Sequence, residues 1–523
     1  MRIRTSRSVR LALLVVAVSI LTGPSASARD GSSLATRIRG VLADKALRGA
    51  VVAIHVETLD EGAVLYTREA DRPLTPGSNV KLLTTAAALH ALGTDYRFRT
   101  TVSTDGSIRG DLLEGDLVLT GGGDPCLSGL FHDGDPTAAL ERLAAEIRER
   151  GIARVRGDLV IDAGFFDEQI HHPSWPADQL HLRYCAPIAA FSINDNCVDF
   201  EIRPARVLGA RAVVEANPVP AGFTIENRVE TVGATRPPRA RIDLQWRETP
   251  GYHFVVRGTI SSNCRPYRAQ APIQQPVWYA AELFREALDL AGIRVEGATR
   301  VRTSTVESRA HLLSRVAHTG TGAGRPQPGF GDVGLGATTI LAEHRSPLVD
   351  GVQVTNERSQ NFYAEQILKT LGRERRANGS FESGCEVVVD FLREIGCETD
   401  GTRLVDGSGL SRSNRVTARS FVKVLRHMLL DTDPDVSRAF FVSLPVSGQR
   451  GSLLSRMKED AYRGRVAAKT GYVYRASALS GYARTDSGET RVFSILMNDF
   501  KAPNSKMKQL QDRIVRYLVD GAR

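Results

Sequence analysis

The chain has 523 residues, of which 42% are hydrophobic and 24% charged, an ordinary globular composition in a chain too long for one compact core. Two or three domains are therefore expected. The formal net charge is +9, and four of the positive charges are arginines within the first ten residues, so the rest of the chain is mildly basic and has no nucleic-acid-binding signature.

The N-terminal residues 1–28 have the three features of a secretory signal peptide. A positively charged start precedes an apolar run from Leu11 to Leu21, and Ala26-Ser27-Ala28 provides a small-residue cleavage site. We predict cleavage after Ala28 and a periplasmic or extracellular protein. The alternative is an uncleaved membrane anchor, but the apolar run is shorter than the ~20 residues of a spanning helix. No later segment is long and apolar enough to span a membrane.

Residues 29–99 are predicted to form the first part of an α+β domain. An amphipathic stretch from Ser32 to Leu47 is followed by two strands, Ala50–Val56 and Ala63–Tyr66, around a short turn. Two strands followed by a helix favour a sheet with a helix against one face.

Ser78 and Lys81 are the first candidates for chemistry. Pro76 and Gly77 interrupt the chain before a run of helix formers, so Ser78 is expected at a helix start, where free backbone N–H groups favour developing negative charge. Lys81 lies three residues later, so its amine can reach the serine oxygen and act as its base once burial and a second cation lower its pKa. The spacing alone is weak evidence, because it recurs at Ser420/Lys423, Ser455/Lys458 and Ser505/Lys508.

Residues 100–334 are predicted to be a β-rich inserted region. Short β-rich runs broken by glycine, proline and aspartate are interrupted by two helical stretches, Ala138–Arg150 and Val277–Ala291. We expect two small subdomains with a boundary near residue 200. Residues 318–334 are rich in glycine and proline and are expected to form a loop or linker.

Six cysteines make disulfides possible in an exported protein. Cys185/Cys197 and Cys385/Cys397 are each twelve residues apart, and either pair could close a loop; Cys126 and Cys264 complete the set. Six cysteines allow 15 pairings, which the sequence does not distinguish, and buried free thiols are the alternative.

Residues 335–523 are predicted to complete the α+β domain. Helices are expected over Pro347–Leu371, Glu382–Ile395 and Ala418–Leu430, strands over Gly464–Val473, Ser477–Thr485 and Thr490–Met497, and a closing amphipathic helix over Asn504–Val519. Three antiparallel strands and a terminal helix would complete the sheet begun near residue 50. Such a helix can instead anchor at a membrane surface, but this one lacks aromatic anchors apart from Tyr517, so packing on the sheet is favoured.

Two further short motifs follow Ser78-x-x-Lys81 in order. Ser359-Gln360-Asn361 falls in the helical segment that starts at Pro347, and Lys469-Thr470-Gly471 falls on the first of the three late strands. Ser-x-Asn recurs at 192–194 and 261–263, whereas Lys-Thr-Gly occurs once. The ordered set is therefore much stronger evidence than any one motif.

This ordered set resembles the penicillin-recognising serine acyl-transferases. Flanking segments narrow the resemblance to the class C low-molecular-mass penicillin-binding proteins, the D-alanyl-D-alanine carboxypeptidases/endopeptidases of peptidase family S13. These segments are Gly115-Asp116-Leu117-Val118-Leu119, Gly122-Gly123-Asp124-Pro125, Gly157-Asp158-Leu159-Val160-Ile161-Asp162, Asp406-Gly407-Ser408-Gly409-Leu410-Ser411-Arg412 and Leu444-Pro445-Val446-Ser447-Gly448.

The resemblance runs from about residue 35 to the end of the chain. Its most telling feature is the 278 positions between Lys81 and Ser359, a gap that holds two inserted domains in that family and is much shorter in β-lactamases. It implies an α+β fold: a transpeptidase-like domain, with an antiparallel sheet flanked by helices, and a large β-rich insertion between the first and second motifs.

The resemblance also implies catalytic roles. Ser78 Oγ would attack the carbonyl of a D-Ala-D-Ala bond and form an acyl-enzyme, and Lys81 would accept the serine proton. Ser359 would relay a proton to the departing D-alanine nitrogen. Asn361 would hold the substrate's amide and help to orient Lys81.

The third motif is expected to bind substrate. Lys469 would supply positive potential for the terminal carboxylate and help to lower the pKa of Lys81, and Thr470 would donate a hydrogen bond to that carboxylate. Gly471 would leave room for substrate to lie antiparallel to the strand. The backbone N–H groups of Ser78 and Tyr472 would form the oxyanion hole, each donor worth roughly 3–4 kcal/mol. Tyr472 departs from the family, which more often has a small hydroxyl residue there, so carboxylate contacts and β-lactam affinity are expected to differ.

The expected partners are peptidoglycan stem peptides and β-lactams, with no nucleic acid and no cofactor, and peripheral association with membrane or wall is compatible with the sequence. His171, His172, His181 and Cys185 lack the spacing of a metal site. Asp406 is expected to cap a turn rather than to buttress the active site. Two alternatives stay open: a serine β-lactamase, and a non-catalytic cell-wall-binding protein that retains the fold.

Overall fold

The computed structural model describes residues 26–247, 252–303 and 338–521, with side chains from residue 34 onward. Its centre is a five-stranded antiparallel sheet in the order β18-β19-β20-β1-β2. The strands are β1 (Val51–Thr58), β2 (Val64–Arg68), β18 (Val466–Val473), β19 (Ala476–Arg484) and β20 (Thr490–Asn498). As predicted, the late strands complete the sheet that begins near residue 50.

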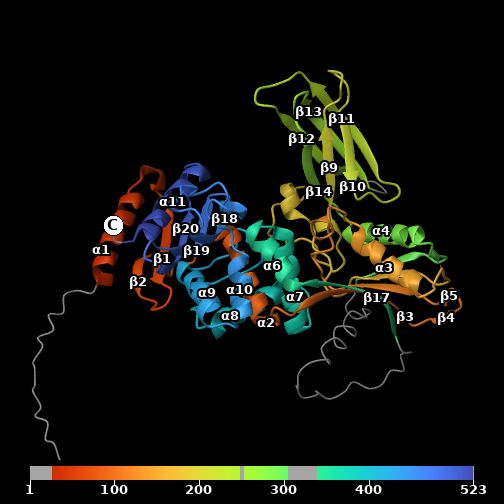
Figure 1. Cartoon of the computed structure of the whole chain (residues 1–523), viewed down its shortest axis with the longest axis horizontal. Helices are drawn as coiled ribbons and strands as arrows, with labels where there is room; N and C mark the ends of the chain where they lie inside the picture. The colour runs from red at the N-terminus through yellow and green to blue at the C-terminus, as the bar shows by residue number, and fades with distance from the viewer. Residues whose placement is uncertain (1–25, 248–251, 304–337, 522–523) are drawn as a thin grey trace, which may run out of the picture.

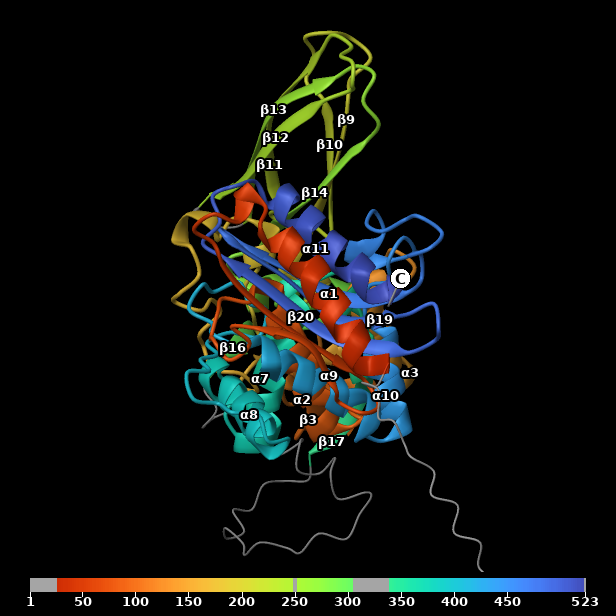
Figure 2. The same ribbon diagram turned by 90° about the vertical axis from the view of Figure 1, so that its left-hand side faces the viewer.

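Helices cover both faces of this sheet (Figures 1 and 2). One face packs against α1 (Ala26–Leu42) and α11 (Asn504–Asp520), and the other against a group of helices around α2 (Val80–Leu92). That group is α6 (Leu348–Glu357), α7 (Asn361–Arg376), α8 (Phe381–Glu394), α9 (Ala418–Leu430) and α10 (Pro434–Val442). Because both faces are covered, β19 and β20 are buried along nearly their whole length instead of alternating between buried and exposed positions.

Helix α2 is the central helix of this group. It is buried from Val80 to Leu89 because its side chains, apart from Lys81, are apolar or small all round, the pattern of a core helix. It contacts α6, α7, α8, α9 and α10. The short 3-10 turn η2 (Gly77–Asn79) leads into it, so the position of Ser78 is held by the packed core rather than by a surface loop.

The inserted region forms a second body with its own core. Its larger sheet has the order β16-β8-β6-β3-β17 and its smaller one the order β15-β7-β5-β4, with α3 (Ala138–Glu149) and α4 (Pro276–Leu290) packed together against them. The strands are β3 (Arg97–Thr104), β4 (Ser107–Arg109), β5 (Leu112–Glu114), β6 (Leu117–Gly121), β7 (Arg154–Val155), β8 (Leu159–Asp162), β15 (Arg294–Val295), β16 (Thr299–Arg302) and β17 (Thr339–Pro347).

Two three-stranded sheets stand away from the rest of the molecule (Figure 1). They consist of β9 (Cys197–Arg203), β10 (Val213–Asn217), β11 (Thr224–Val232), β12 (Ala240–Arg247), β13 (His253–Ser261) and β14 (Tyr267–Pro272). The chain leaves the first inserted subdomain at β9, close to the boundary expected near residue 200, and returns to it at α4. The second subdomain is therefore nested inside the first instead of following it.

Two predicted boundaries differ from the structure. The helix expected over Pro347–Leu371 is broken into α6 and α7, because Ser359 has a positive φ of 58° that no α-helix accommodates. The second part of the main domain, expected from residue 335, begins only after β17, because β17 pairs with β3 in the inserted sheet. The sequence does not predict β17, whose pairing is interrupted by an irregularity between Ile340 and Ala342.

Short 3-10 turns connect several elements. Besides η2 they are η1 (Lys45–Leu47), η3 (Gly129–Phe131), η4 (Ala177–Gln179), η5 (Arg183–Cys185), η6 (Asn194–Asn196) and η8 (Gly451–Leu453). All six cysteines lie in the described ranges, and none of them forms a disulfide there. The region expected to be a linker at 318–334 lies outside the described residues. Among the helices that the structure describes, none has the length and apolar character needed to cross a membrane.

Candidate active site

Ser78 lies where η2 runs directly into α2. The first N–H groups of a helix have no intrahelical partner, so they and the positive end of the helix dipole favour negative charge at the serine. A hydrogen bond of 3.0 Å joins Lys81 Nζ to Ser78 Oγ. The predicted nucleophile and base are therefore in contact.

Two further hydrogen bonds hold the amine of Lys81. Its Nζ lies 2.7 Å from Asn361 Oδ1 and 2.7 Å from the carbonyl oxygen of Ser408. The side chain is completely buried, and this burial lowers the pKa of Lys81 to about 7, against the opposing effect of the negative charges on Glu365 and Asp406. A lysine with such a pKa is neutral in a large share of molecules at neutral pH and can accept the serine proton.

Glu365 is a buried carboxylate on α7 that faces this lysine. Its Oε2 accepts the N–H of Gly407 and its Oε1 the N–H of Ser408, both at 2.8 Å. Burial raises the pKa of Glu365 above its usual value, with a further contribution from the charge on Asp406. The two hydrogen bonds fix the loop that presents the Ser408 carbonyl to Lys81, so Glu365 positions the base as well as acting on its charge.

Asp406 organises the next turn of the same loop. Its oxygens accept hydrogen bonds from the backbone N–H of Gly409 at 2.9 Å and of Ser411 at 2.6 Å, from Trp175 Nε1 at 3.0 Å and from Asn414 Nδ2 at 2.7 Å. This is the structural role expected for it. Because the loop touches Lys81, the same contacts also support the site.

The second motif lies in the break between α6 and α7. Ser359 points toward the third motif, and its Oγ accepts a hydrogen bond of 2.7 Å from Lys469 Nζ. Asn361 opens α7 and places Oδ1 on Lys81, while its Nδ2 donates to the carbonyl of Tyr184 at 2.9 Å. The positive φ of Ser359 is what turns the serine and the asparagine toward the same cavity.

The third motif lies on β18, the edge strand beside the nucleophile. Lys469 is completely buried, and its Nζ also donates to the carbonyl of Thr470 at 3.1 Å. Burial, and then the nearby amine of Lys81, hold the pKa of Lys469 well below its usual value. The hydroxyl of Thr470 donates to Ser452 Oγ at 2.8 Å. The amine of Lys469 is therefore engaged by Ser359 and by its own strand.

The outer edge of β18 brings one backbone N–H to the nucleophile. Ala468 N–H bonds the carbonyl of Pro445 on that edge, and the two-residue period of a strand directs the N–H of Tyr472 to the same side. A Cβ built on Gly77 would lie 2.9 Å from Tyr472 N, so this strand and η2 are in close contact. The backbone N–H of Tyr472 therefore lies beside the turn that carries Ser78, and the oxyanion hole formed by these two groups stays a prediction.

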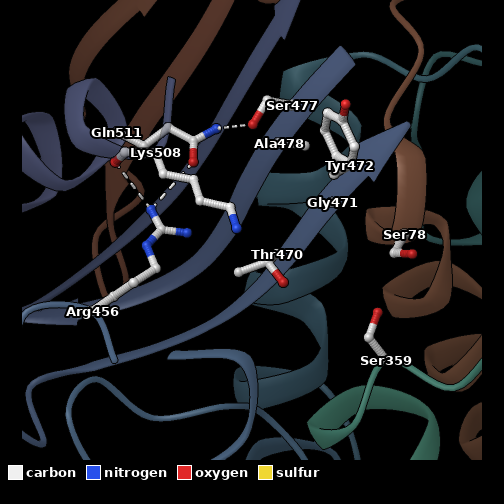
Figure 3. A pocket seen from close by; sticks show the side chains of 10 residues that line it. All are labelled: Ser78, Ser359, Arg456, Thr470, Gly471, Tyr472, Ser477, Ala478, Lys508 and Gln511. Carbon is white, nitrogen blue, oxygen red and sulfur yellow. Dashed lines mark hydrogen bonds between the residues drawn. The ribbon is translucent and has the colours of Figure 1, made fainter. Parts of the chain in front are cut away.

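These groups surround a cavity of about 160 Å³ (Figure 3). Ser78 and Ser359 lie on one side of the cavity and β18 forms its floor. Side chains from α11 and from the loop between η8 and β18 close the other side. The lining residues are Ser78, Ser359, Arg456, Thr470, Gly471, Tyr472, Ser477, Ala478, Lys508 and Gln511. The side chain of Tyr472 is 52% exposed and its ring points away from the two serines (Figure 3).

The structure brings all eight predicted site residues together. Five of them line the cavity: Ser78, Ser359, Thr470, Gly471 and Tyr472. The other three, Lys81, Asn361 and Lys469, are joined to Ser78 and Ser359 by hydrogen bonds or through one another. Among the described residues, no cluster of three or more His, Cys, Asp or Glu could hold a metal ion.

Sequence reasoning missed Glu365, Arg456 and Lys508. Glu365 lies one helical turn after Asn361 on α7, so the two side chains share a face of the helix. This spacing could have identified Glu365 as a neighbour of the site. Lys508 appeared only as one of several Ser-x-x-Lys repeats. Nothing in the sequence places α11 beside β18 closely enough to bring that lysine to the cavity.

Nearly the whole chain matches one known protein family. The sequence profile of the D-Ala-D-Ala carboxypeptidase 3 (S13) family matches residues 34–318 and 330–519. The chain is 31% identical over 524 aligned residues to the D-alanyl-D-alanine carboxypeptidase of Actinomadura sp. (strain R39), covering 95% of this chain and 88% of that protein. It is 24% identical to the D-alanyl-D-alanine carboxypeptidase DacB of Haemophilus influenzae, covering 91% of each.

A solved structure has the same fold. The crystal structure of penicillin binding protein 4 (dacB) from Haemophilus influenzae superposes with a TM-score of 0.72 at 22% identity, covering 92% of this chain and 98% of that one. The same Haemophilus protein has also been solved in complex with a β-lactam, and that structure matches with a TM-score of 0.68 at 21% identity, covering 92% of this chain and 99% of the other. The predicted α+β fold is confirmed.

Proposed function

The chain belongs to the S13 family of D-Ala-D-Ala carboxypeptidases, and we propose that it cleaves the terminal D-Ala-D-Ala bond of peptidoglycan stem peptides through an acyl-enzyme on Ser78. The observation that carries the assignment of residues is the contact of Lys81 Nζ with Ser78 Oγ at 3.0 Å, in a buried site where the pKa of the lysine falls to about 7. Serine acyl transfer requires a serine nucleophile and, within hydrogen-bond reach, a base whose pKa lies near the operating pH.

Acylation begins when Ser78 Oγ attacks the carbonyl carbon of the penultimate D-alanine. The serine proton passes to the neutral amine of Lys81, and the oxygen of the tetrahedral intermediate accepts hydrogen bonds from the N–H groups of Ser78 and Tyr472. The C–N bond then breaks. The departing nitrogen takes the proton of Ser359 Oγ, and Ser359 recovers a proton from Lys469, whose Nζ contacts its Oγ at 2.7 Å. The proton that Lys81 took from Ser78 then restores Lys469.

Hydrolysis of the ester completes the cycle. A water molecule attacks the acyl carbon, its proton passes to Lys81, and Ser78 Oγ leaves with a proton returned from that lysine. The products are free D-alanine and a stem peptide shortened by one residue. Asn361 holds the base throughout, since its amide bridges Lys81 and the carbonyl of Tyr184.

The decisive experiment combines labelling with product analysis. Purified protein is treated with a fluorescent penicillin, and separately with a stem pentapeptide and a cross-linked dimer whose products are identified by mass. We expect a covalent label that is absent in Ser78→Ala, and loss of one alanine from the pentapeptide. Cleavage of the dimer would add endopeptidase action. An unlabelled protein that releases no alanine would contradict the proposal and favour a wall-binding protein.

The lifetime of the penicillin adduct tests the β-lactamase alternative. A peptidase of this family is expected to hold the adduct for minutes or longer, because its site is built for a peptide leaving group. Release within seconds would favour a β-lactamase. The measurement is the loss of label from protein that has been separated from free penicillin.

Export outside the cytoplasmic membrane is part of the proposal. It is supported by the charged start, apolar run and Ala26-Ser27-Ala28 of the first 28 residues, and by the location that a peptidoglycan substrate requires. Protein recovered from the cell envelope is expected to begin at Arg29. Recovery of the intact N-terminus from membranes would instead indicate an uncleaved anchor.

A further inference from the structure

The side chain of Lys508 lines the cavity but has no role in the reaction steps proposed above. Lys508 lies on α11, the helix that packs on the sheet face opposite α2, and lines the cavity together with Ser78 and Ser359. Its side chain reaches from α11 toward the part of β18 that holds Thr470 and Gly471 (Figure 3). Lys508 is exposed. Among the described residues, only its backbone carbonyl takes part in a hydrogen bond with a side chain, and its amine forms no ion pair.

The backbone of Lys508 is firmly anchored. Arg456 is buried and bonds Asp512 with Nε at 2.9 Å and Nη2 at 2.7 Å, and the same Nη2 donates to the carbonyl of Lys508 at 3.3 Å. Gln511 Nε2 donates to Ser477 Oγ on β19 at 3.2 Å. Asp512 is therefore committed to Arg456, so the acid one turn after Lys508 is not free to neutralise it.

The position of the leaving group follows from Ser359. The hydroxyl that protonates the departing nitrogen is held by Lys469, so the C-terminal residue of the substrate lies on that side, over Thr470. Its carboxylate is two bonds from the departing nitrogen. The groups already present there are engaged: Lys469 bonds Ser359 and the Thr470 carbonyl, and the Thr470 hydroxyl donates to Ser452.

The charge balance of the cavity also favours an anion. Among its ten lining residues are Arg456 and Lys508 and no acidic residue. Lys469 is completely buried, and its amine already bonds Ser359 Oγ and the carbonyl of Thr470. Of the cations at the cavity, only Lys508 is both exposed to it and without a partner among the residues the structure describes.

Resting on the proposed function, we propose that Lys508 is a specificity-determining residue that pairs with the α-carboxylate of the substrate's C-terminal residue. The interaction is made equally before and during attack, so it strengthens binding rather than speeding the chemical step. Because that residue departs with the leaving group, the acyl-enzyme formed from a peptide no longer carries this carboxylate. Its hydrolysis does not depend on Lys508.

The test compares two peptides that differ only at their C-terminus: an acylated D-Ala-D-Ala peptide with a free carboxylate, and the same peptide as its carboxamide. Lys508→Gln is expected to lower kcat/KM for the carboxylate peptide about tenfold, mainly through KM, as for the loss of one hydrogen bond to a charged group. The carboxamide peptide should change less than about twofold. Lys508→Arg keeps the charge and should keep most of the preference for the carboxylate.

Lys506→Gln is the matched control. It removes a lysine from the same helix, but Lys506 bonds Asp44 at 3.0 Å and does not line the cavity. Both peptides should react with this variant as with the wild type. Thermal unfolding of each variant separates loss of binding from loss of fold.

Two results would overturn the inference while leaving the proposed function intact: unchanged kinetics in Lys508→Gln, or an equal loss for both peptides. Either would occur with a wild-type enzyme that still releases D-alanine and still loses its penicillin label in Ser78→Ala. A wild-type protein that cleaves neither peptide would overturn the proposed function and this inference with it.

Discussion

Lys81 and Lys469 lie on either side of the two serine hydroxyls, but their surroundings differ. Lys81 is near Glu365 and Asp406, whose negative charges partly offset the cost of burial, and its pKa stays at about 7. At Lys469, burial and the nearby amine of Lys81 act in the same direction and hold the pKa well below its usual value. Each amine therefore disfavours the protonation of the other, so a neutral Lys81 can accept the serine proton while Lys469 stays in contact with Ser359.

The pH dependence of acylation follows from Lys81. The base must be neutral, and an amine is neutral above its pKa, so the rate of labelling by a fluorescent penicillin should rise as pH increases through about 7 and level off above it. Lys81→Arg should lose roughly 100-fold or more at every pH, because a guanidinium stays protonated. Lys501→Arg, on the exposed surface, is the control. A flat profile would argue against Lys81 as the base.

Glu365→Gln tests the charge that opposes this shift. Removing a negative charge that raises the pKa of Lys81 should move the rise in acylation rate to lower pH. The amide can accept only one of the two backbone N–H groups of Gly407 and Ser408, so stability should fall by about 1–3 kcal/mol. The measurements are the pH profile and thermal unfolding. Glu386→Gln, an exposed residue of α8, should change neither.

At the scale of elements, three segments from distant parts of the chain are held in register by backbone contacts. A Cβ on Gly471 of β18 would lie 2.4 Å from the carbonyl of Pro76, and one on Gly409 would lie 1.9 Å from the carbonyl of Gly77. The nucleophile turn η2 is therefore clamped between the edge strand and the loop of residues 406–414. Small residues are required at these contacts because the backbones themselves touch.

Gly409→Ala should displace the nucleophile turn. Gly409 has φ +78°, and Gly49 has the same φ but no atom within 4 Å of an added Cβ, so Gly49→Ala reproduces the left-handed strain without the collision. Both variants should lose about 1–2 kcal/mol of stability from that strain. Only Gly409→Ala should also lose penicillin acylation, which we expect to fall by more than 100-fold. Equal acylation in the two variants would show that this contact does not position Ser78.

At the scale of the whole molecule, the inserted region contacts the candidate active site. Its loops supply the Tyr184 carbonyl to Asn361, a carboxylate of Asp195 to Gln360 at 2.9 Å and the indole N–H of Trp175 to Asp406. Trp175 packs in the main core with Phe381, whereas the sheets β9–β14 stand away from it. The first inserted subdomain therefore supports the site, and the nested one projects from it.

Trp175→Phe tests this coupling. Trp175 is 5% exposed, and its loss would remove one of the hydrogen bonds that hold Asp406. We expect stability to fall by about 1–3 kcal/mol and the acylation rate to drop, because the loop that positions Lys81 loosens. Trp278→Phe is the control, since Trp278 on α4 is 42% exposed. An unchanged acylation rate in Trp175→Phe would show that the insertion does not act on the site.

Local sequence signals predicted much of this molecule. Thr417 accepts the N–H of Ser420 and begins α9 at Ala418, which is the predicted start, and the apolar period of α11 gave its position within one residue. The spacing of Ser78 and Lys81 acts within one turn of chain, so it was visible without any tertiary information. The break at Ser359 was not, because Leu348–Arg376 has a helical pattern throughout and a single left-handed residue leaves no trace in that pattern.

The sequence by itself determined the order of the three motifs, the elements that carry them and the family to which they belong, because each depends on residues close together in the chain. Only the tertiary structure decided the pKa of Lys81, the part played by Glu365 and Trp175, and the arrival of Lys508 at the cavity. These depend on burial and on contacts between segments hundreds of residues apart, which chain packing sets and no local pattern encodes.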